Sequence, residues 1–332
     1  MKIIKLVFHF LLFIKIFFTS SFASDFEQWK KDFKKYALSE GISQKTLDKI
    51  IDNSKFLSDV IKYDRYQPEF YEDTSTYISK RTSSKKISSG KDLYKKNNEL
   101  IDIVSNKYSV DKFLLLALMG IETNFGTYLG KMDIVSSLAT LSFDQRRSAF
   151  FTKELIILLK LVDIGIVNPE TLYGSWAGAF GNFQFMPSTI KGHAIDYNKD
   201  NIIDLKGIDD SFASAANYLN NLGWKNEMPC FYKIQLSDKI PDKYLNTSAK
   251  KLKNKKKVKY FKKYISNNEF LNNFDELNAA IITPDAEIVD NPDKLNPAYI
   301  VFDNYELILK WNRSLRFGLA VCTLKESFES EL

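Results

Sequence analysis

The stretch GIETNFG, residues 120–126, places one carboxylate at the end of an apolar run. The eight residues 113–120 carry no charge, and Glu122 follows them almost at once. A run that is apolar on all sides predicts a buried helix, and Asp111 is a suitable N-cap. Burial and the negative C-terminal end of the helix dipole both favour a neutral carboxyl group. Glu122 is therefore a candidate general acid, and a plain helix cap or ion pair is the commoner alternative.

Other kinds of hydrolytic chemistry have few residues to draw on. Without residues 1–23 the chain keeps one histidine, His193, and two cysteines, Cys230 and Cys322. A zinc site rich in His or Cys cannot be built from so few ligands. A Ser–His–Asp triad would depend on His193 alone. Catalysis therefore falls to aspartate and glutamate. The two cysteines either pair, as in many exported proteins, or remain two separate buried thiols.

A second stretch, residues 173–189, has the composition of a carbohydrate site. Its glycines and alanines let a backbone come close to a ligand. Ser175, Asn182 and Gln184 supply neutral hydrogen-bonding groups, and five aromatic residues supply flat faces. Neutral donors and acceptors combined with flat apolar faces suit a sugar. The alternative is a glycine-rich corner that is only tightly packed.

Four motifs occur in order and at family spacing: GIETNFG, SSLATLSFDQRR, GSWAGAFGNFQFMPST and AANYLNNLGW. Together they resemble the lytic murein transglycosylase B family, most strongly from Tyr77 to Trp224. The resemblance implies a lysozyme-like core that cleaves the β-1,4 bond between N-acetylmuramic acid and N-acetylglucosamine in peptidoglycan. It implies that Glu122 is the catalytic residue. It also implies a set of substrate-binding residues, namely Tyr77, Arg146, Arg147, Ser175, Gln184 and Asn312.

Most glycosidases use two carboxylates, whereas the resemblance implies a single one here. Glu122 would protonate the leaving oxygen and then accept the proton of the muramic C6 hydroxyl, which gives a 1,6-anhydro end. Asp144 is the candidate for a second carboxylate, although we expect it to pair with Arg146 or Arg147. The chain departs from the family at Trp311 and Phe317, where tyrosines are usual.

Residues 196–204 have the spacing of an EF-hand-like loop. Asn201 takes the place of the usual glycine, and asparagine tolerates the left-handed conformation. Either the loop binds a structural ion, for which the family resemblance implies Ca²⁺ or Na⁺, or it is a polar turn without metal. The catalytic scheme itself requires no cofactor. The candidate ligands are Asp196, Asn198, Asp200, Ile202 through its carbonyl, and Asp210, with Asp204 at the ninth position of the loop.

These residues must be positioned by the helices and strands of the fold. The helices and strands expected from the sequence indicate a mainly α fold of the α+β class. We expect a lysozyme-like helical core, an N-terminal helical subdomain and a small β-rich insertion. Helical spacing recurs through residues 25–80, and the polar stretch 81–92 is expected to be a loop at a domain boundary. The expected segments are 1–23 (signal peptide), 24–91 (helical), 92–227 (catalytic core), 228–300 (β-rich) and 301–332 (a C-terminal helix that returns to the core).

The first 23 residues differ in kind from the rest. Lys2 and Lys5 precede the apolar run LVFHFLLFIKIFF, and small residues stand at positions 21 and 23. This order is typical of a secretory signal cleaved near Ala23, and a retained membrane anchor is the alternative. We therefore expect a periplasmic protein, either free or associated with the membrane.

The charge of the chain bears on its partners. Three lysines and no acid lie in residues 1–23, so their removal lowers the formal net charge from +6 to +3. So small a charge does not predict binding to nucleic acid. The lysine-rich run 250–263 is expected to be a solvated face, with an anionic wall polymer or lipid head group as the alternative ligand. The resemblance implies peptidoglycan glycan strands as the partner, with other cell-wall enzymes as candidates, and we expect a monomer.

Three functions are open at this point. The first is the lytic transglycosylase, and the second is a muramidase that uses water. The third is a scaffold that binds the cell wall without cutting it. The presence of Glu122 in an apolar setting favours the two enzymes over the scaffold.

Overall fold

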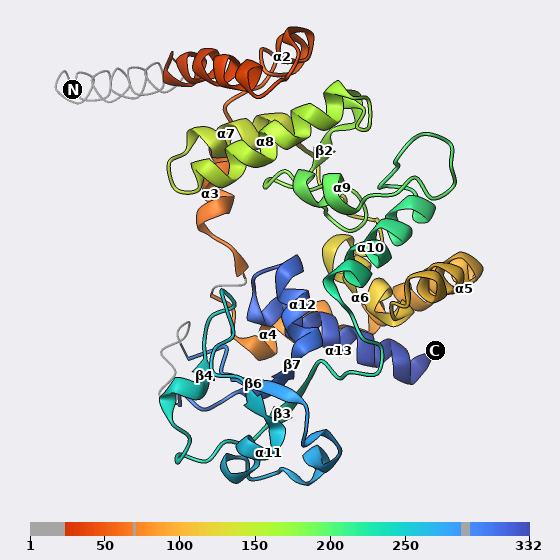
Figure 1. Cartoon of the computed structure of the whole chain (residues 1–332), viewed down its shortest axis with the longest axis vertical. Helices are drawn as coiled ribbons and strands as arrows, with labels where there is room; N and C mark the ends of the chain where they lie inside the picture. Colours follow the sequence, from red (N-terminus) through yellow and green to blue (C-terminus); the bar gives the residue numbers. More distant parts are fainter. Residues whose placement is uncertain (1–23, 69–70, 287–292) are drawn as a thin grey trace, which may run out of the picture. The chain divides into compact units, whose positions relative to one another are not determined.

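The computed structural model describes residues 24–68, 71–286 and 293–332. The chain forms two compact units, each built from several stretches of sequence (Figure 1). Unit 1 contains the chain up to Arg65, Leu129–Phe180 and Gln184–Gly192, and unit 2 contains Tyr66–Tyr128, Gly181–Phe183 and His193–Leu332. The signal peptide expected at 1–23 lies outside the described residues, and the division into five segments stays a prediction.

Unit 1 is a small helical body. Its first helical stretch covers 24–39. The other helices are α2 (Gln44–Ile50), α3 (Ser58–Arg65), α7 (Ile134–Phe143), α8 (Ser148–Asp163), the 3-10 helix η2 (Pro169–Thr171) and α9 (Pro187–His193). Two short strands, β1 (Met132–Asp133) and β2 (Tyr173–Gly174), pair antiparallel.

Aromatic side chains attach the first helix to α7. The ring of Phe143 meets Phe26 edge-on at 5.5 Å and Trp29 at 6.3 Å between centroids. Phe26, Trp29 and Phe33 stand at the helical spacing that the sequence predicted, and Trp29 stacks on Phe33 at 5.1 Å. The predicted N-terminal helix is therefore confirmed, and its apolar face packs onto Phe143 at the end of α7.

Unit 2 is organised around one buried helix. The helices of this unit are α4 (Thr74–Arg81), α5 (Ser84–Tyr108), α6 (Lys112–Thr123), α10 (Ile208–Leu222), α12 (Asp303–Trp311) and α13 (Leu315–Glu331). Helix α6 packs against α13, α5 and α10, and its residues 114–120 are all buried. The Asp111 carboxylate accepts the Phe113 N–H at 2.8 Å, so the predicted N-cap is confirmed.

The expectation of a loop at 81–92 is wrong. Helix α5 begins at Ser84, and the Ser83 hydroxyl caps it by accepting the Lys86 N–H. Gly90 is not a loop former here, because the ring of Phe328 lies where its Cβ would stand. Serine and glycine indicate a loop when they are read locally, whereas here one caps the helix and the other makes room for α13. The expected C-terminal helix is in fact the two helices α12 and α13.

A five-stranded sheet occupies the C-terminal part of unit 2. The strand order is β3-β7-β6-β4, and β5 pairs with β6 outside this path. All pairs are antiparallel except β4 with β6. The strands are β3 (Phe231–Ile234), β4 (Leu245–Asn246), β5 (Lys256–Lys257), β6 (Asn278–Ile282) and β7 (Ala298–Phe302). Between them lie α11 (Val258–Phe261) and the 3-10 helices η3 (Asp242–Tyr244), η4 (Lys262–Tyr264) and η5 (Glu269–Phe274).

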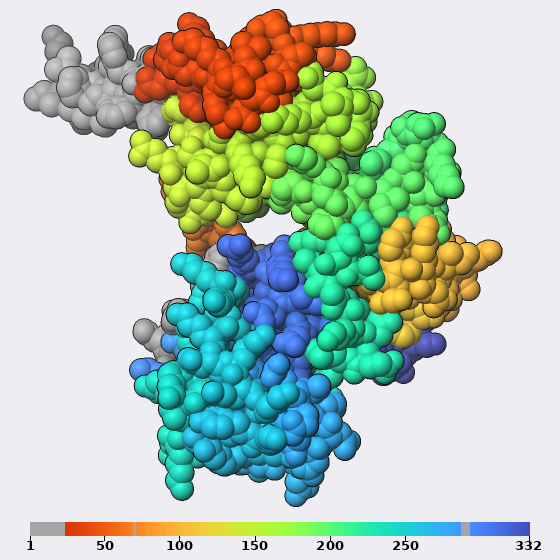
Figure 2. All heavy atoms as spheres, viewed as in Figure 1, coloured from red at the N-terminus to blue at the C-terminus, as the bar shows by residue number. Residues whose placement is uncertain are grey.

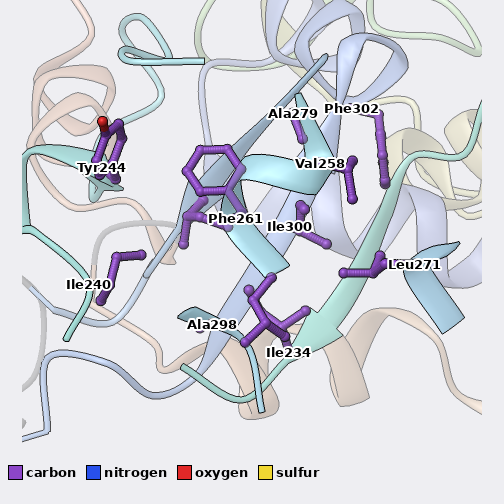
Figure 3. Packing of buried hydrophobic residues seen from close by; sticks show 12 residues of the cluster. Ile234, Ile240, Tyr244, Val258, Phe261, Leu271, Ala279, Ala298, Ile300 and Phe302 are labelled. Atoms are coloured by element: carbon purple, nitrogen blue, oxygen red, sulfur yellow. The ribbon is translucent and has the colours of Figure 1, made fainter. Parts of the chain in front are cut away.

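The sheet has its own apolar core. Figure 3 shows Val258 and Phe261 of α11 beside Ile300 of β7, and all three side chains are fully buried. Residues 231–282 fill one continuous body, drawn in cyan to light blue in Figure 2. A disulfide joins Cys230, just before β3, to Cys322 on α13, so the first of the two alternatives for the cysteines holds. The mainly helical α+β class is confirmed, and no described helix is both long and apolar enough to cross a membrane.

Candidate active site

Glu122 is half-buried in the last turn of α6. The indole Nε1–H of Trp311, the last residue of α12, donates a hydrogen bond to Glu122 Oε1 at 3.1 Å. The indole ring packs against Tyr218 and Phe183, with centroids 5.2 and 6.2 Å away. The acid therefore stands at a helix end beside an aromatic group. The sequence had marked Trp311 only as a departure from the family pattern.

The residues after Glu122 form an unusual turn. Asn124, Phe125 and Gly126 all have positive φ, at 50°, 59° and 77°, a conformation that L-residues avoid. The buried Thr123 hydroxyl supports this turn, because it accepts the Gly126 N–H at 3.0 Å and donates to the Asn182 carbonyl at 2.8 Å. The T-N-F-G sequence thus ends α6 directly behind the acid and fixes its last turn.

Gly120 and Phe125 are fitted to each other. A Cβ on Gly120 would stand 2.7 Å from Phe125 Cζ, so the ring occupies the space that any side chain at 120 would need. The same ring lies edge-on to Phe328 of α13 at 6.4 Å. The first glycine of GIETNFG is therefore required by packing within unit 2.

Asn182 has a structural role that its sequence context did not suggest. It is only 2% exposed. Its N–H donates to the Leu205 carbonyl at 2.7 Å, and its Nδ2 donates to Lys206 O and Ser211 Oγ, each at 3.0 Å. The expectation that this amide serves a sugar is therefore wrong. Its side-chain amide donates its hydrogen bonds inside unit 2, and its backbone carbonyl accepts the hydrogen bond from the Thr123 hydroxyl.

Ser175 and Gln184 lie in unit 1, at the two ends of the glycine-rich segment. The Ser175 hydroxyl accepts the Ala179 N–H at 3.0 Å, which closes a tight turn. Gln184 has φ 48°, and its Nε2 donates to the Leu129 carbonyl at 3.3 Å. Both side chains are half-buried, and their expected contact with substrate stays a prediction.

The two adjacent arginines share one partner within unit 1. Arg146 Nε donates to Asp64 Oδ2 at 2.7 Å, and Arg147 pairs with Asp64 Oδ1. Asp64 is nearly fully buried on α3, while both arginines stay part-exposed. Asp144 instead pairs with Arg65 at 2.9 Å. The expected pairing of Asp144 with Arg146 or Arg147 is thus wrong, because Asp64, 82 residues from Arg146 in sequence, takes both guanidinium groups.

Tyr77 and Asn312 belong to unit 2, as Glu122 does. Tyr77 is buried, and the Arg81 guanidinium lies over its ring at 3.4 Å. Asn312 directly follows Trp311 at the end of α12 and is half-buried. Asn312 is therefore adjacent in sequence to Trp311, whose indole contacts Glu122. The roles expected for both residues in substrate binding stay predictions.

The expected metal loop folds through its own hydrogen bonds. Asp196 accepts backbone N–H groups from Lys199 and Asn201 at 2.7 and 2.8 Å. Asn201 has φ 70°, as its place in the loop predicted. Asp210 is buried, and its two oxygens accept the N–H groups of Tyr197 and Asp204.

These bonds bear on whether an ion fits. Within the described ranges, no three His, Cys, Asp or Glu side chains gather closely enough to hold a metal ion. Two of the candidate ligands, the Asn198 side chain and the Ile202 carbonyl, are oxygen donors suited to calcium. The loop thus has the donor types for a hard cation, while its carboxylates are turned toward the backbone.

Comparisons with known proteins agree with these features. A family model described as "Transglycosylase SLT domain" matches residues 25–326. Membrane-bound lytic murein transglycosylase B of Escherichia coli K12 is 40% identical over 118 residues, which make up 35% of this chain and 33% of that protein. The matched region therefore spans about a third of the length of this relative.

Solved structures are similar over most of the chain. SltB3 from Pseudomonas aeruginosa in complex with NAG-NAM-pentapeptide has a TM-score of 0.78 and 29% identity, and the match covers 92% of this chain and 79% of that one. The Escherichia coli lytic transglycosylase Slt35 in complex with calcium has a TM-score of 0.74 and 23% identity, and the match covers 92% and 93% of the two chains. The latter likeness shows the fold alone.

Proposed function

The chain belongs to the transglycosylase SLT domain family, and from this premise we propose that it is a peptidoglycan lytic transglycosylase. Its bond of attack is the β-1,4 link between N-acetylmuramic acid and N-acetylglucosamine. The observation that carries the proposal is the setting of Glu122. This carboxyl group is half-buried at the end of an apolar helix and accepts a hydrogen bond from Trp311.

The proposed reaction needs one acid–base residue. Neutral Glu122 gives its proton to the leaving glycosidic oxygen as the C1–O bond breaks, and the 2-acetamido group of the substrate stabilises the developing cation. The Glu122 carboxylate then takes the proton of the C6 hydroxyl as O6 bonds to C1. Glu122 ends neutral again, the product carries a 1,6-anhydro ring, and no water is consumed.

A hydrolytic muramidase is the second candidate, and it would need another carboxylate. Asp144 is the residue proposed for that role from the sequence. Its ion pair with Arg65 favours a structural function for it. A scaffold that only binds the wall is the third candidate. The hydrogen bonds that hold Glu122 and Thr123 in place at the end of α6 favour an enzyme over it.

Further site roles are part of the same proposal. We assign substrate contacts to Tyr77, Arg146, Arg147, Ser175, Gln184 and Asn312, on the strength of the family motifs. Asp64 holds the two arginines and would set their orientation.

The cell compartment is also a proposal. Peptidoglycan as the proposed substrate and the signal peptide expected at 1–23 support a periplasmic location, free or associated with the membrane. The Cys230–Cys322 disulfide supports an oxidising compartment.

We also propose that the loop at 196–210 takes a structural Ca²⁺ or Na⁺, which plays no part in the chemistry. Its carboxylates would have to exchange some backbone N–H partners for the ion. Millimolar calcium should then raise the Tm, and EDTA should reverse the rise. An unchanged Tm in both solutions would identify the loop as a polar turn closed by hydrogen bonds alone.

Digestion of purified peptidoglycan tests the proposed function. Residues 24–332 are compared with Glu122→Gln, and the masses of released muropeptides are recorded. We expect ends lighter by one water, and a loss of about 10²–10⁴-fold in the glutamine variant, the usual contribution of an acid–base group. Glu227→Gln is the matched control, because this glutamate is exposed in the same unit.

Each other outcome identifies a rival. Reducing ends at full mass would show a muramidase, and Asp144→Asn would be the next variant. Binding to intact sacculi without soluble fragments from any variant would support the scaffold. Normal activity in Glu122→Gln would contradict the assignment of the acid.

A further inference from the structure

We propose that Trp311 is a positioning residue that determines which oxygen of Glu122 carries the catalytic proton. The proposal rests on the proposed function for its consequences in catalysis. Its structural basis is separate, namely the bond from the indole Nε1–H to Glu122 Oε1 at 3.1 Å.

The donor and the acceptor of this bond differ in what they can do. An indole Nε1–H can only donate a hydrogen bond. A neutral carboxylic acid has one O–H group that donates, while its carbonyl oxygen can only accept. A proton on Oε1 directed along this bond would meet the indole hydrogen. The bond therefore favours Oε1 as the carbonyl oxygen of neutral Glu122, with the proton on Oε2. A tyrosine at 311 would make no such choice, because a phenol hydroxyl both donates and accepts.

The indole is itself held in place. Its ring lies 5.2 Å from that of Tyr218 with an interplanar angle of 35°, and 6.2 Å from that of Phe183 at 63°. Phe183 meets Phe212 of α10 edge-on at 5.2 Å. The position of Trp311 is also fixed along the chain, since α12 ends there and the backbone is extended at Asn312. The donor therefore has little freedom to follow a rotation of the carboxyl group.

Other titratable groups stand near this pair. Tyr218 packs on Trp311, and burial raises the pKa of its phenol. His193 lies 4.5 Å from the Tyr218 ring, and burial lowers the pKa of its imidazole. The Lys86 ammonium donates to the Gly120 carbonyl on α6, and its pKa is lowered chiefly by burial. Any pH readout must therefore separate Glu122 from His193, because an imidazole ordinarily titrates near neutrality.

The direct test is NMR of the indole N–H groups. The chain has four tryptophans, and Trp311→Phe identifies the resonance of Trp311. We expect this resonance to shift with pH as Glu122 ionises, and we expect Glu122→Gln to abolish that titration while His193→Gln leaves it in place. A Trp311 indole resonance with the same chemical shift and pH dependence in wild type and in Glu122→Gln would overturn the proposal. This measurement requires no enzymatic activity.

The kinetic test compares Trp311→Phe with Trp311→Tyr on peptidoglycan. Phenylalanine keeps an apolar ring but removes the donor, and loss of a bond to a charged group costs roughly tenfold in rate. We expect kcat to fall about tenfold with KM changed less than about twofold. The basic limb of the pH profile of kcat/KM should move up by about one pH unit. The reason is that the Glu122 carboxylate loses a hydrogen-bond donor that stabilised its charged form. The tyrosine variant should recover part of the rate.

Trp224→Phe is the matched control, since its indole donates to Asn226 and not to an acid. A Trp311→Phe enzyme with the wild-type rate and pH profile would refute the positioning role. Equal losses in the phenylalanine and tyrosine variants without a shifted limb would show a packing role instead, and would also refute it. If the wild type itself makes no product, the proposed function fails, and the NMR titration still decides whether the Trp311 indole donates to Glu122.

Discussion

Thr123 supports the turn behind the acid, and replacing it with valine isolates the contribution of its hydroxyl. Valine has nearly the same shape, and Thr123 is 1% exposed, so the packing changes little. The substitution removes both the acceptor of the Gly126 N–H and the donor to the Asn182 carbonyl. The three left-handed residues after Thr123 then lose their nearest support.

The size of the effect follows from these two bonds. A buried polar group that loses its partner costs about 1–3 kcal/mol. Gly126 is only half-buried, so its N–H contributes at the low end of that range. The extra methyl group of valine recovers about 0.8 kcal/mol. We therefore expect a loss of about 1–3 kcal/mol in the free energy of unfolding, or about 3–9 °C in Tm.

Urea unfolding measures this loss, and digestion of peptidoglycan measures its effect on Glu122. We expect turnover to fall together with stability, because Glu122 and Thr123 share the last turn of α6. Thr123→Ser is the matched control, since it retains the hydroxyl and loses one methyl group, at about 1 kcal/mol. A valine variant as stable as wild type would refute the reasoning. A serine variant as unstable as the valine variant would show that the methyl group carries the effect.

Other parts of the molecule give further tests. Reduction of the Cys230–Cys322 disulfide should lower the free energy of unfolding by about 4–5 kcal/mol, because the link closes a loop across a sequence separation of 92; urea curves with and without dithiothreitol measure this, and coincident curves would contradict it. Gly120→Ala should cost about 1–3 kcal/mol through overpacking against the neighbouring aromatic ring, whereas Gly192→Ala, with open space around it, should not lower the Tm. Burial lowers the pKa of His193. The contribution of the neutral imidazole to stability is therefore complete above about pH 6.5 and is lost as pH falls through the folded pKa. The drop in Tm between pH 7.5 and 5 should be smaller in His193→Gln than in wild type, and an equal drop would show that the imidazole is not responsible.

Local patterns predicted much of the helical framework. Helix α6 was predicted from its apolar run and from Asp111, because both signals act within a few residues. The same holds for the left-handed Asn201. The position of Glu122 at the end of α6 could also be predicted, since it follows from the length of the run.

The partners of the site residues could not be predicted in this way. Trp311 and Glu122 lie 189 residues apart, and nothing local in either segment indicates their hydrogen bond. Asp64 occurs in an ordinary polar helix, and only the fold brings it to Arg146 and Arg147. Gly90 was misread for the same reason, because its small size is required by a ring from α13. Contacts across long sequence separations depend on tertiary packing, which composition and spacing do not encode.

The Cys230–Cys322 link has a consequence for survival among proteases. The exposed lysines between positions 250 and 257 are sites where a trypsin-like enzyme would cut, and they lie inside the loop that the disulfide closes. A single cut there leaves two fragments that are still joined through sulfur, with β3 on one side and α13 on the other. The nicked protein would keep its sheet and the helix packed against α6 in one molecule. On a denaturing gel it would migrate as two pieces only after reduction.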